Sequence, residues 1–213
     1  MRYFVSTSSD LYALGAHTAV GVVTGPCVDG LGSIRTGRVW ISDNDAPSGN
    51  GYDEDAFLAH LERLAPYRTT CVFLVVPDIF QDGQTTRVMC EHFAPELAPL
   101  GFPLACILQD GAEQDDFPPC DAVFLAGSDP WRHAHGAALL ARAKRDGLHA
   151  RVGRVNSRRH LQGLSLAHAN STGGTYVGFR GVWRGLREVA GWLNASAQPP
   201  LITLDPRPER SAS

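Results

Sequence analysis

The chain has 213 residues, of which 44% are hydrophobic and 19% are charged. The length suits one large domain, and the apolar fraction is ample for a buried core, so an intrinsically disordered chain is excluded. No apolar run approaches the roughly 18 residues that a membrane helix needs, and the first residues lack the pattern of a signal peptide. We therefore expect a cytoplasmic protein without a membrane partner.

Basic residues are concentrated in one part of the chain. The net charge is −3, yet residues 131–187 hold eleven Lys and Arg and a single acid, while the remainder holds eight basic and 21 acidic residues. A one-sided basic surface is what a polyanion such as nucleic acid requires, and the alternative is a set of solvated helix faces. The residues expected to contact phosphates are Arg151, Arg154, Asn156, Arg158, Arg159, Arg180 and Arg184.

Metal and cofactor motifs are not recognisable. The five cysteines are odd in number and widely spaced, at positions 27, 71, 90, 106 and 120, which predicts neither a structural zinc site nor a disulfide framework. No GxGxxG or Walker loop follows a predicted strand, which argues against the usual dinucleotide and nucleoside-triphosphate sites. We therefore expect no metal and no cofactor.

In chain order, short apolar runs alternate with amphipathic stretches. The runs predict strands at 3–7, 19–24, 38–42, 71–77, 103–108, 122–126, 149–153 and 175–178. The amphipathic stretches predict helices at 11–17, 53–65, 84–97, 132–146, 157–168 and 182–194. Asp53 is the expected N-cap of the second helix, and Gly147 is expected just after the end of the fourth.

The predicted strands are nearly continuous apolar runs, which is typical of a parallel sheet that is buried on both faces. Eight such strands predict a compact (β/α)8 TIM-like barrel in residues 1–195, with residues 196–213 as a flexible tail. A doubly wound open parallel sheet is the alternative, because strand order along the sequence does not show closure. The oligomeric state stays open.

Polar residues and glycines follow five successive strands. In either architecture the active site lies at the carboxyl ends of the strands, so these residues are expected to converge on one pocket. They are Asp43, Asn44, Asp45, Asp78, Gln109, Gly127, Ser128 and Arg154. The alternative is that they only form turns and helix caps. Carboxylates, an amide and backbone N–H groups together suit a planar ligand that both donates and accepts hydrogen bonds, such as a purine.

Several segments resemble the tRNA-guanine transglycosylase superfamily, and especially its short phage-encoded relatives that place 7-deazaguanines in DNA. The segments at 42–46, 77–78, 108–111, 126–128 and 152–157 match the family's motifs in order. The resemblance implies a (β/α)8 barrel that exchanges guanine for a free 7-deazaguanine in DNA, rather than in tRNA. It places the protein in the host cytoplasm if a phage encodes it. It also implies that Asp43 is catalytic and that Asp43, Asn44, Asp78, Gln109, Gly127 and Ser128 bind the base.

The sequence departs from this family at the position of the catalytic nucleophile. The family has an Asp where this chain has Gly173, and the family's zinc ligands are missing as well. Asp45 is the candidate replacement, since it stands two residues after Asp43. Two other functions stay open: a barrel that binds a nucleobase or modified DNA without turnover, and a hydrolytic N-glycosidase.

Overall fold

A computed structural model describes residues 1–6, 19–28, 31–45, 52–179 and 181–197. Eight parallel strands close into a barrel in the order of the sequence. They are β1 (Arg2–Ser6), β2 (Val20–Thr24), β3 (Trp40–Ser42), β4 (Cys71–Val75), β5 (Leu104–Leu108), β6 (Ala122–Leu125), β7 (His149–Val152) and β8 (Ser171–Gly173). Because β8 pairs with β1, with Arg2 opposite Ser171, the predicted (β/α)8 barrel is confirmed and the open sheet is wrong.

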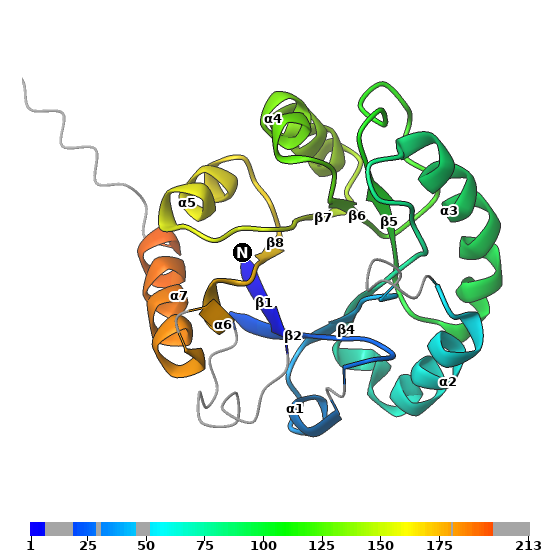
Figure 1. The fold of residues 1–213 in the computed structure, drawn as a ribbon, viewed down its shortest axis with the longest axis horizontal. Coiled ribbons are helices and arrows are strands. Elements are labelled where there is room, and N and C mark those ends of the chain that lie inside the picture. The colour runs from blue at the N-terminus through cyan, green and yellow to red at the C-terminus, as the bar shows by residue number, and fades with distance from the viewer. Residues whose placement is uncertain (7–18, 29–30, 46–51, 180, 198–213) are drawn as a thin grey trace, which may run out of the picture.

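Helices surround the ring of strands (Figure 1). They are α1 (Leu31–Arg35), α2 (Glu54–Leu64), α3 (Gly83–Leu97), α4 (Asp129–Arg145), α5 (Arg158–Leu166), α6 (Tyr176–Phe179) and α7 (Val182–Ala197), with 3-10 turns at Ala65–Thr70 and Ala98–Leu100. The Asp53 side chain caps α2 by accepting from the Ala56 N–H, as predicted. Gly147 has the expected left-handed backbone, with φ +73°. Among the described helices, none combines the length and apolar character that crossing a bilayer requires.

The predicted eighth strand is wrong. Residues 175–178 were expected to be extended, but Tyr176–Phe179 forms α6 and the strand is Ser171–Gly173. The Asn156 side chain accepts a hydrogen bond from the Tyr176 N–H at the start of α6. A β-branched and aromatic composition favours a strand only where neighbouring strands are free to pair with it. Ser171–Gly173 already pairs with both β7 and β1, so residues 175–178 have no strand to pair with there. The helix expected at 11–17 lies outside the described residues, as does the predicted tail 196–213 apart from residues 196 and 197, which end α7.

Two of the cysteines are paired, contrary to the sequence-based expectation. Cys90 of α3 and Cys106 of β5 form a disulfide, with Cα atoms 6.0 Å apart. The two residues are separated by 16 positions and belong to no short motif. Their pairing follows from the packing of α3 on β5, which the spacing of cysteines does not reveal.

The barrel has one core outside the strands and another inside. The outer core joins strand residues such as Tyr3 and Val22 to helix residues such as Leu61. The inner core consists of strand residues alone, namely Phe4, Ile41, Phe73, Val75, Ala105, Ile107 and Ala122. Because side chains alternate along a strand, Phe4 points inward while its two neighbours point outward. The same alternation turns His149 and Arg151 of β7 into the barrel.

Glycines make room for the large inward side chains. A Cβ added to Gly21 would collide with the Phe4 ring. A Cβ added to Gly173 would collide with the Phe4 carbonyl oxygen and would lie 2.8 Å from Arg151 Nη2. Gly173 is therefore needed for close packing between β8, β1 and the guanidinium of Arg151.

We expect Gly173→Ala to lower the free energy of unfolding by about 2 kcal/mol, because the added methyl group overpacks the barrel interior. Gly191→Ala in α7 is the matched control, since nothing lies within 4 Å of its Cβ position. The control should be neutral or stabilising, because Ala favours helix more than Gly does. Urea unfolding of both variants measures the difference, and equal stability of the two variants would contradict the packing argument.

Candidate functional site

A pocket of about 280 Å³ opens at the carboxyl ends of the strands. Its polar lining includes Asp43 after β3, Asp78 after β4, Gln109 after β5 and Arg151 in β7. The sequence-based prediction that Asp43, Asp78 and Gln109 come together at one barrel mouth is therefore met by the geometry. Parallel strands direct their carboxyl ends to one rim, which is why residues far apart in sequence meet here.

Asp78 is held by a network of amide groups. Its two carboxylate oxygens accept from Asn44 Nδ2 at 3.3 Å and from Gln109 Nε2 at 2.8 Å. Gln109 is itself oriented, because its Oε1 accepts from the Gln81 N–H at 3.2 Å. Burial raises the pKa of Asp78, and the hydrogen bonds from Asn44 and Gln109 oppose this rise. Asn44 thus acts through Asp78 and is not itself among the residues that line the pocket.

Asp43 is a partly buried carboxyl group with a fixed orientation. Its Oδ1 accepts from the backbone N–H groups of Asn44 at 2.9 Å and Asp45 at 3.3 Å. Burial raises the pKa of Asp43 above its ordinary value. The Asp45 N–H and the Arg151 charge lower it, whereas the charges of Asp45 and Asp78 raise it further. A carboxyl group with a raised pKa in a pocket is a candidate for proton transfer.

Arg151 lies inside the barrel below this pocket. Its Nη1 donates to the Thr172 carbonyl at 3.0 Å, and its guanidinium carbon lies 5.3 Å from the Phe4 ring centroid and 5.0 Å from that of Phe124. Burial lowers the pKa of Arg151 to about 10, so the group stays charged at neutral pH. Its Nε is buried without a hydrogen-bond partner. Among the described residues, no carboxylate lies within 4.0 Å of the Arg151 nitrogens.

The sequence-based assignment of Arg151 to a phosphate-binding surface is wrong, because the side chain is only 5% exposed. The alternation of side chains along β7 could have shown that Arg151 points into the barrel, because Ala150 and Val152 on either side of it face the outer core. His149, two positions earlier, shares the inward face and lies against the Phe73 ring. Burial, together with the charge of Arg151, lowers the pKa of His149 to about 4, so this residue is neutral at physiological pH.

Two further arginines line the rim of the pocket. Arg132 of α4 is buried and pairs with Asp129, while its Nη1 has no hydrogen-bond partner. Arg154 follows β7 with a left-handed φ of +58°, and its guanidinium carbon lies 4.9 Å from the centroid of the Phe80 ring. Phe80 is 47% exposed, so this stacked pair forms an open edge of the pocket.

Three of the residues expected at the site lie elsewhere. The Asp45 side chain packs against Gly25 and accepts from the Cys27 N–H at 2.8 Å. Ser128 caps α4 and is bound by Asp110 through both its N–H and its hydroxyl, each at 2.6 Å. Gly127 packs against Asp110 and Trp131. None of Asp45, Gly127 and Ser128 is among the pocket-lining residues.

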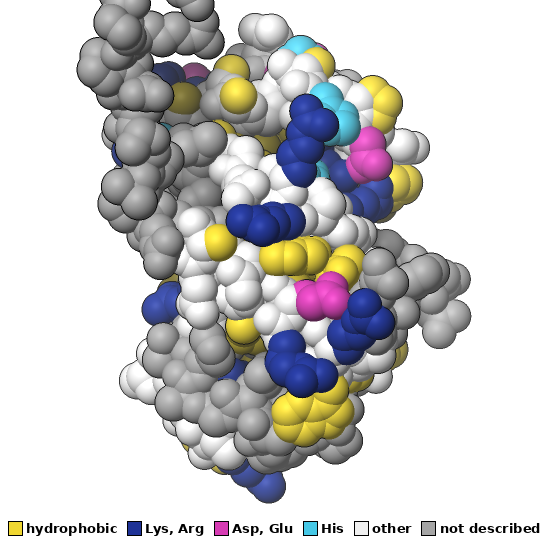
Figure 2. Space-filling model, turned by 90° about the vertical axis from the view of Figure 1, so that its left-hand side faces the viewer, with side chains coloured by type: hydrophobic (Ala, Val, Ile, Leu, Met, Phe, Trp, Pro, Cys, Tyr) yellow, Lys and Arg dark blue, Asp and Glu magenta, His cyan; other side chains and the backbone are white. Residues whose placement is uncertain are grey.

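Apart from the buried Arg151, the described residues expected to bind nucleic acid are exposed. Arg158 and Arg159 are exposed on α5, and Arg180 lies outside the described residues. Asn156 has a structural contact, since it accepts from the Tyr176 N–H. Figure 2 shows Lys and Arg side chains distributed over the face that carries α5 and α7, with His side chains among them towards α4. Binding of DNA by these residues stays a prediction.

Within the described ranges, no group of three His, Cys, Asp or Glu side chains is arranged to hold a metal ion. The polar groups at the barrel mouth instead form an array of buried carboxyl, amide and guanidinium groups. Such an array can bind an anion and transfer protons.

The chain matches no family model and no curated protein sequence. It is similar in fold to an enolase superfamily member from Listeria innocua, with 11% identity, TM-score 0.47 and coverage of 78% of this chain and 46% of that one. An enolase family member from Agrobacterium tumefaciens with homology to dipeptide epimerases gives 12% identity, TM-score 0.49 and coverage of 83% and 55%. The Bacillus subtilis YkuI protein with an EAL domain gives 11%, 0.39 and coverage of 86% and 45%. This chain thus spans about half the length of these proteins.

The identification as a tRNA-guanine transglycosylase relative is wrong, and so is the base-exchange function that followed from it. The solved structures described above are enolase superfamily and EAL-domain proteins, and no family model supports the resemblance. The structure adds a physical reason. Gly173 stands where the family has its nucleophile, and the Phe4 carbonyl and Arg151 leave no room there for a side chain.

The raised pKa of Asp43 leads to a prediction about stability and pH. Because the folded state favours the protonated carboxyl group, stability is lost as the pH rises from about 4, the ordinary pKa, through the raised pKa of the folded protein. Asp43→Asn keeps the shape and cannot ionise. The variant should therefore match the unaltered protein at pH 4 and exceed it in free energy of unfolding at pH 8.

Urea unfolding at the two pH values measures this difference. Asp116→Asn is the control, since Asp116 is exposed and its replacement should change stability little at either pH. A variant at position 43 that is less stable than the unaltered protein at pH 8 would show that the carboxylate is stabilised in the fold, against the argument from burial.

Proposed function

We propose that this protein is an enzyme that performs acid–base chemistry on a small anionic substrate at the carboxyl end of the barrel. The observation that carries the proposal is that one pocket is lined both by Arg151, a buried cation whose Nε has no hydrogen-bond partner, and by Asp43, a partly buried carboxyl group of raised pKa. Perturbed titratable groups that share a cleft are typical of active sites.

Arg151 is the anion-binding group in this proposal. Withdrawing a guanidinium from water costs several kcal/mol, and only an opposite charge with good hydrogen bonds offsets that cost. The Thr172 carbonyl accepts one hydrogen bond, which leaves Nε without a partner. Asp43 is near enough for its charge to raise the pKa of Arg151 but lies beyond ion-pair distance. A substrate carboxylate in the pocket would neutralise the guanidinium and approach Asp43.

Asp43 is the proton-transfer group. Two backbone N–H groups orient its Oδ1, so the carboxyl group presents a fixed direction to the pocket. In its protonated form it can donate to an atom that gains negative charge, and in its ionised form it can take a proton from carbon or oxygen. Asp78 and Gln109 form a polar wall whose positions are fixed by their mutual hydrogen bond.

The pocket volume restricts the substrate. About 280 Å³ is just below the range of roughly 300–1,000 Å³ that is usual for ligand sites. The exposed ring of Phe80 adds an apolar edge. The site therefore suits a metabolite-sized acid better than an extended polymer.

A hydrogen-exchange screen tests this function. The protein is incubated in D2O with small 2-oxo, 2-hydroxy and amino acids. Proton NMR follows the loss of the C2–H signal of the hydroxy and amino acids and of the C3–H signal of the oxo acids. We expect exchange with at least one acid, slowed by about 100-fold or more in Asp43→Asn because the proton-transfer group is lost. Arg151→Met should weaken binding of the same acid, measured by saturation-transfer NMR.

Asp116→Asn serves again as the matched control and should exchange at the rate of the unaltered protein. Binding without exchange would mean a binding protein and not an enzyme. Exchange that persists in Asp43→Asn, or binding that is indifferent to Arg151→Met, would contradict the roles given to these residues.

A further inference from the structure

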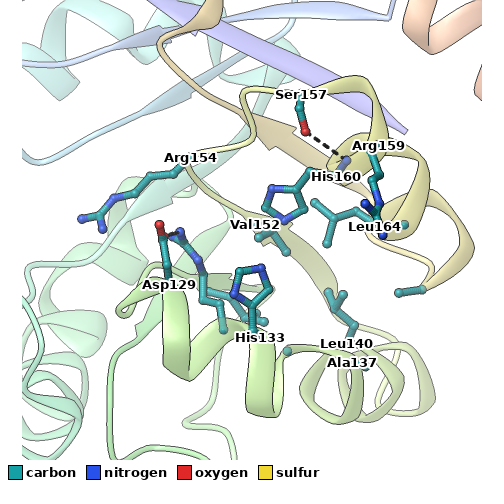
Figure 3. Close-up of a pocket in the computed structure, with 15 residues that line it drawn as sticks. Asp129, His133, Ala137, Leu140, Val152, Arg154, Ser157, Arg159, His160 and Leu164 are labelled. Atoms are coloured by element: carbon teal, nitrogen blue, oxygen red, sulfur yellow. Dashed lines mark hydrogen bonds and ion pairs between the residues drawn. The ribbon is translucent and has the colours of Figure 1, made fainter.

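A second cavity lies between α4 and α5, with a volume of about 580 Å³. Figure 3 shows how its residues are arranged: His133 of α4 and His160 of α5 face each other, and Arg154 and Arg159 stand at its edges. The ring centroids of the two histidines are 6.2 Å apart. The apolar floor includes Leu140, Val152 and Leu164.

The charged lining of this cleft is unbalanced. It contains Arg132, Arg154 and Arg159 against a single acid, Asp129, which leaves two positive charges while the histidines are neutral. The pKa of His160 is lowered, first by burial and then by the charge of Arg132, while Asp129 opposes this fall. The excess of positive charge in the lining disfavours an added cation in this cleft and favours an anion.

Arg132 shows that the site is built into the fold. Its side chain is 6% exposed and belongs to the lining of the cleft. One of its terminal nitrogens is used by Asp129, but Nη1 is buried without a hydrogen-bond partner. A buried guanidinium N–H without an acceptor costs free energy unless a ligand supplies one. This unpartnered Arg132 nitrogen therefore indicates a ligand independently of the exposed Arg154 and Arg159.

We propose that the cleft between α4 and α5 binds the phosphate group of a phosphate monoester. The two uncompensated positive charges match a dianion, and phosphate offers acceptor oxygens in several directions to donors on α4, on α5 and at the end of β7. Arginine is well suited to phosphate because its planar donors bind two oxygens at once. The apolar floor favours an organic group attached to the phosphate over inorganic phosphate alone.

The cleft and the pocket at the barrel mouth share two lining residues, Arg132 and Arg154. Arg154, which has a left-handed backbone, lies at the boundary between the two. If the proposed function holds, on which this step rests, the substrate is a phosphorylated small acid. Its reacting part lies against Asp43 and its phosphate lies in the cleft between α4 and α5.

Isothermal titration calorimetry with phenyl phosphate and with inorganic phosphate tests the site without any turnover. Phenyl phosphate should bind, and more tightly than inorganic phosphate, because its ring contacts the apolar floor. Arg159→Gln should weaken phenyl phosphate binding about tenfold, the effect of losing one charge-assisted hydrogen bond. Arg158→Gln is the matched control: Arg158 is the preceding exposed residue of α5 and does not line the cleft, so the affinity should stay within about twofold.

Equal weakening by the two substitutions would overturn the proposal, as would the absence of phenyl phosphate binding at millimolar concentration. A DNA oligonucleotide that binds with a steep salt dependence, and that loses affinity equally in both variants, would instead indicate a diffuse polyanion surface. Asp43→Asn separates this inference from the proposed function. The variant should keep its affinity for phenyl phosphate even if the exchange screen shows that Asp43 transfers no proton.

Discussion

The guanidinium of Arg151 inside the barrel is the constraint on which the rest of the site depends. Its side chain occupies space that an aliphatic residue would otherwise fill, and Gly173 provides that space by having no Cβ. The flanking rings of Phe4 and Phe124 contact the cation by their π faces, and among the described residues no carboxylate is within ion-pair distance. The interior therefore carries a charge that the described residues only partly compensate, directly below a pocket that opens to solvent.

This charge connects the core to the chemistry at the barrel mouth. Burial and then this charge lower the pKa of His149 to about 4, and the charge also opposes the rise in the pKa of Asp43. The Asp78–Gln109 hydrogen bond holds the opposite wall in place, so the pocket has one cationic and one acidic side. Arg132 lies between the cationic side of this pocket and the α4–α5 cleft, since it lines both. Its Nη1, like Arg151 Nε, is buried without a hydrogen-bond partner. The two proposed anion sites thus adjoin each other and share Arg132 and Arg154 in their linings.

Sequence patterns located most of the barrel because nearly continuous apolar runs are the direct consequence of burial on both faces of each strand. The last strand was predicted at the wrong residues because its own sequence lacks such an apolar run. Ser171–Gly173 is short and polar, and it is a strand only because β7 and β1 present unpaired backbone groups on either side. The pairing of Cys90 with Cys106 was missed because it arises from helix-to-strand packing and not from a local motif.

The sequence by itself predicted parallel strands, in a barrel or an open sheet, and the meeting of Asp43, Asp78 and Gln109, because parallel strands place their carboxyl ends on one side. Closure of the barrel came from the pairing of β8 with β1. It did not determine which strand-end groups face the pocket. Asp43 and Asp45 are two residues apart, yet only Asp43 lines the pocket. Asp45 has a left-handed φ of +56°, and its side chain contacts the turn at Gly25 instead. Only the tertiary structure decided that Arg151 points inward and that α4 and α5 enclose a basic cleft. These features depend on closure of the barrel, which brings together residues from opposite ends of the chain, such as Phe4 and Arg151.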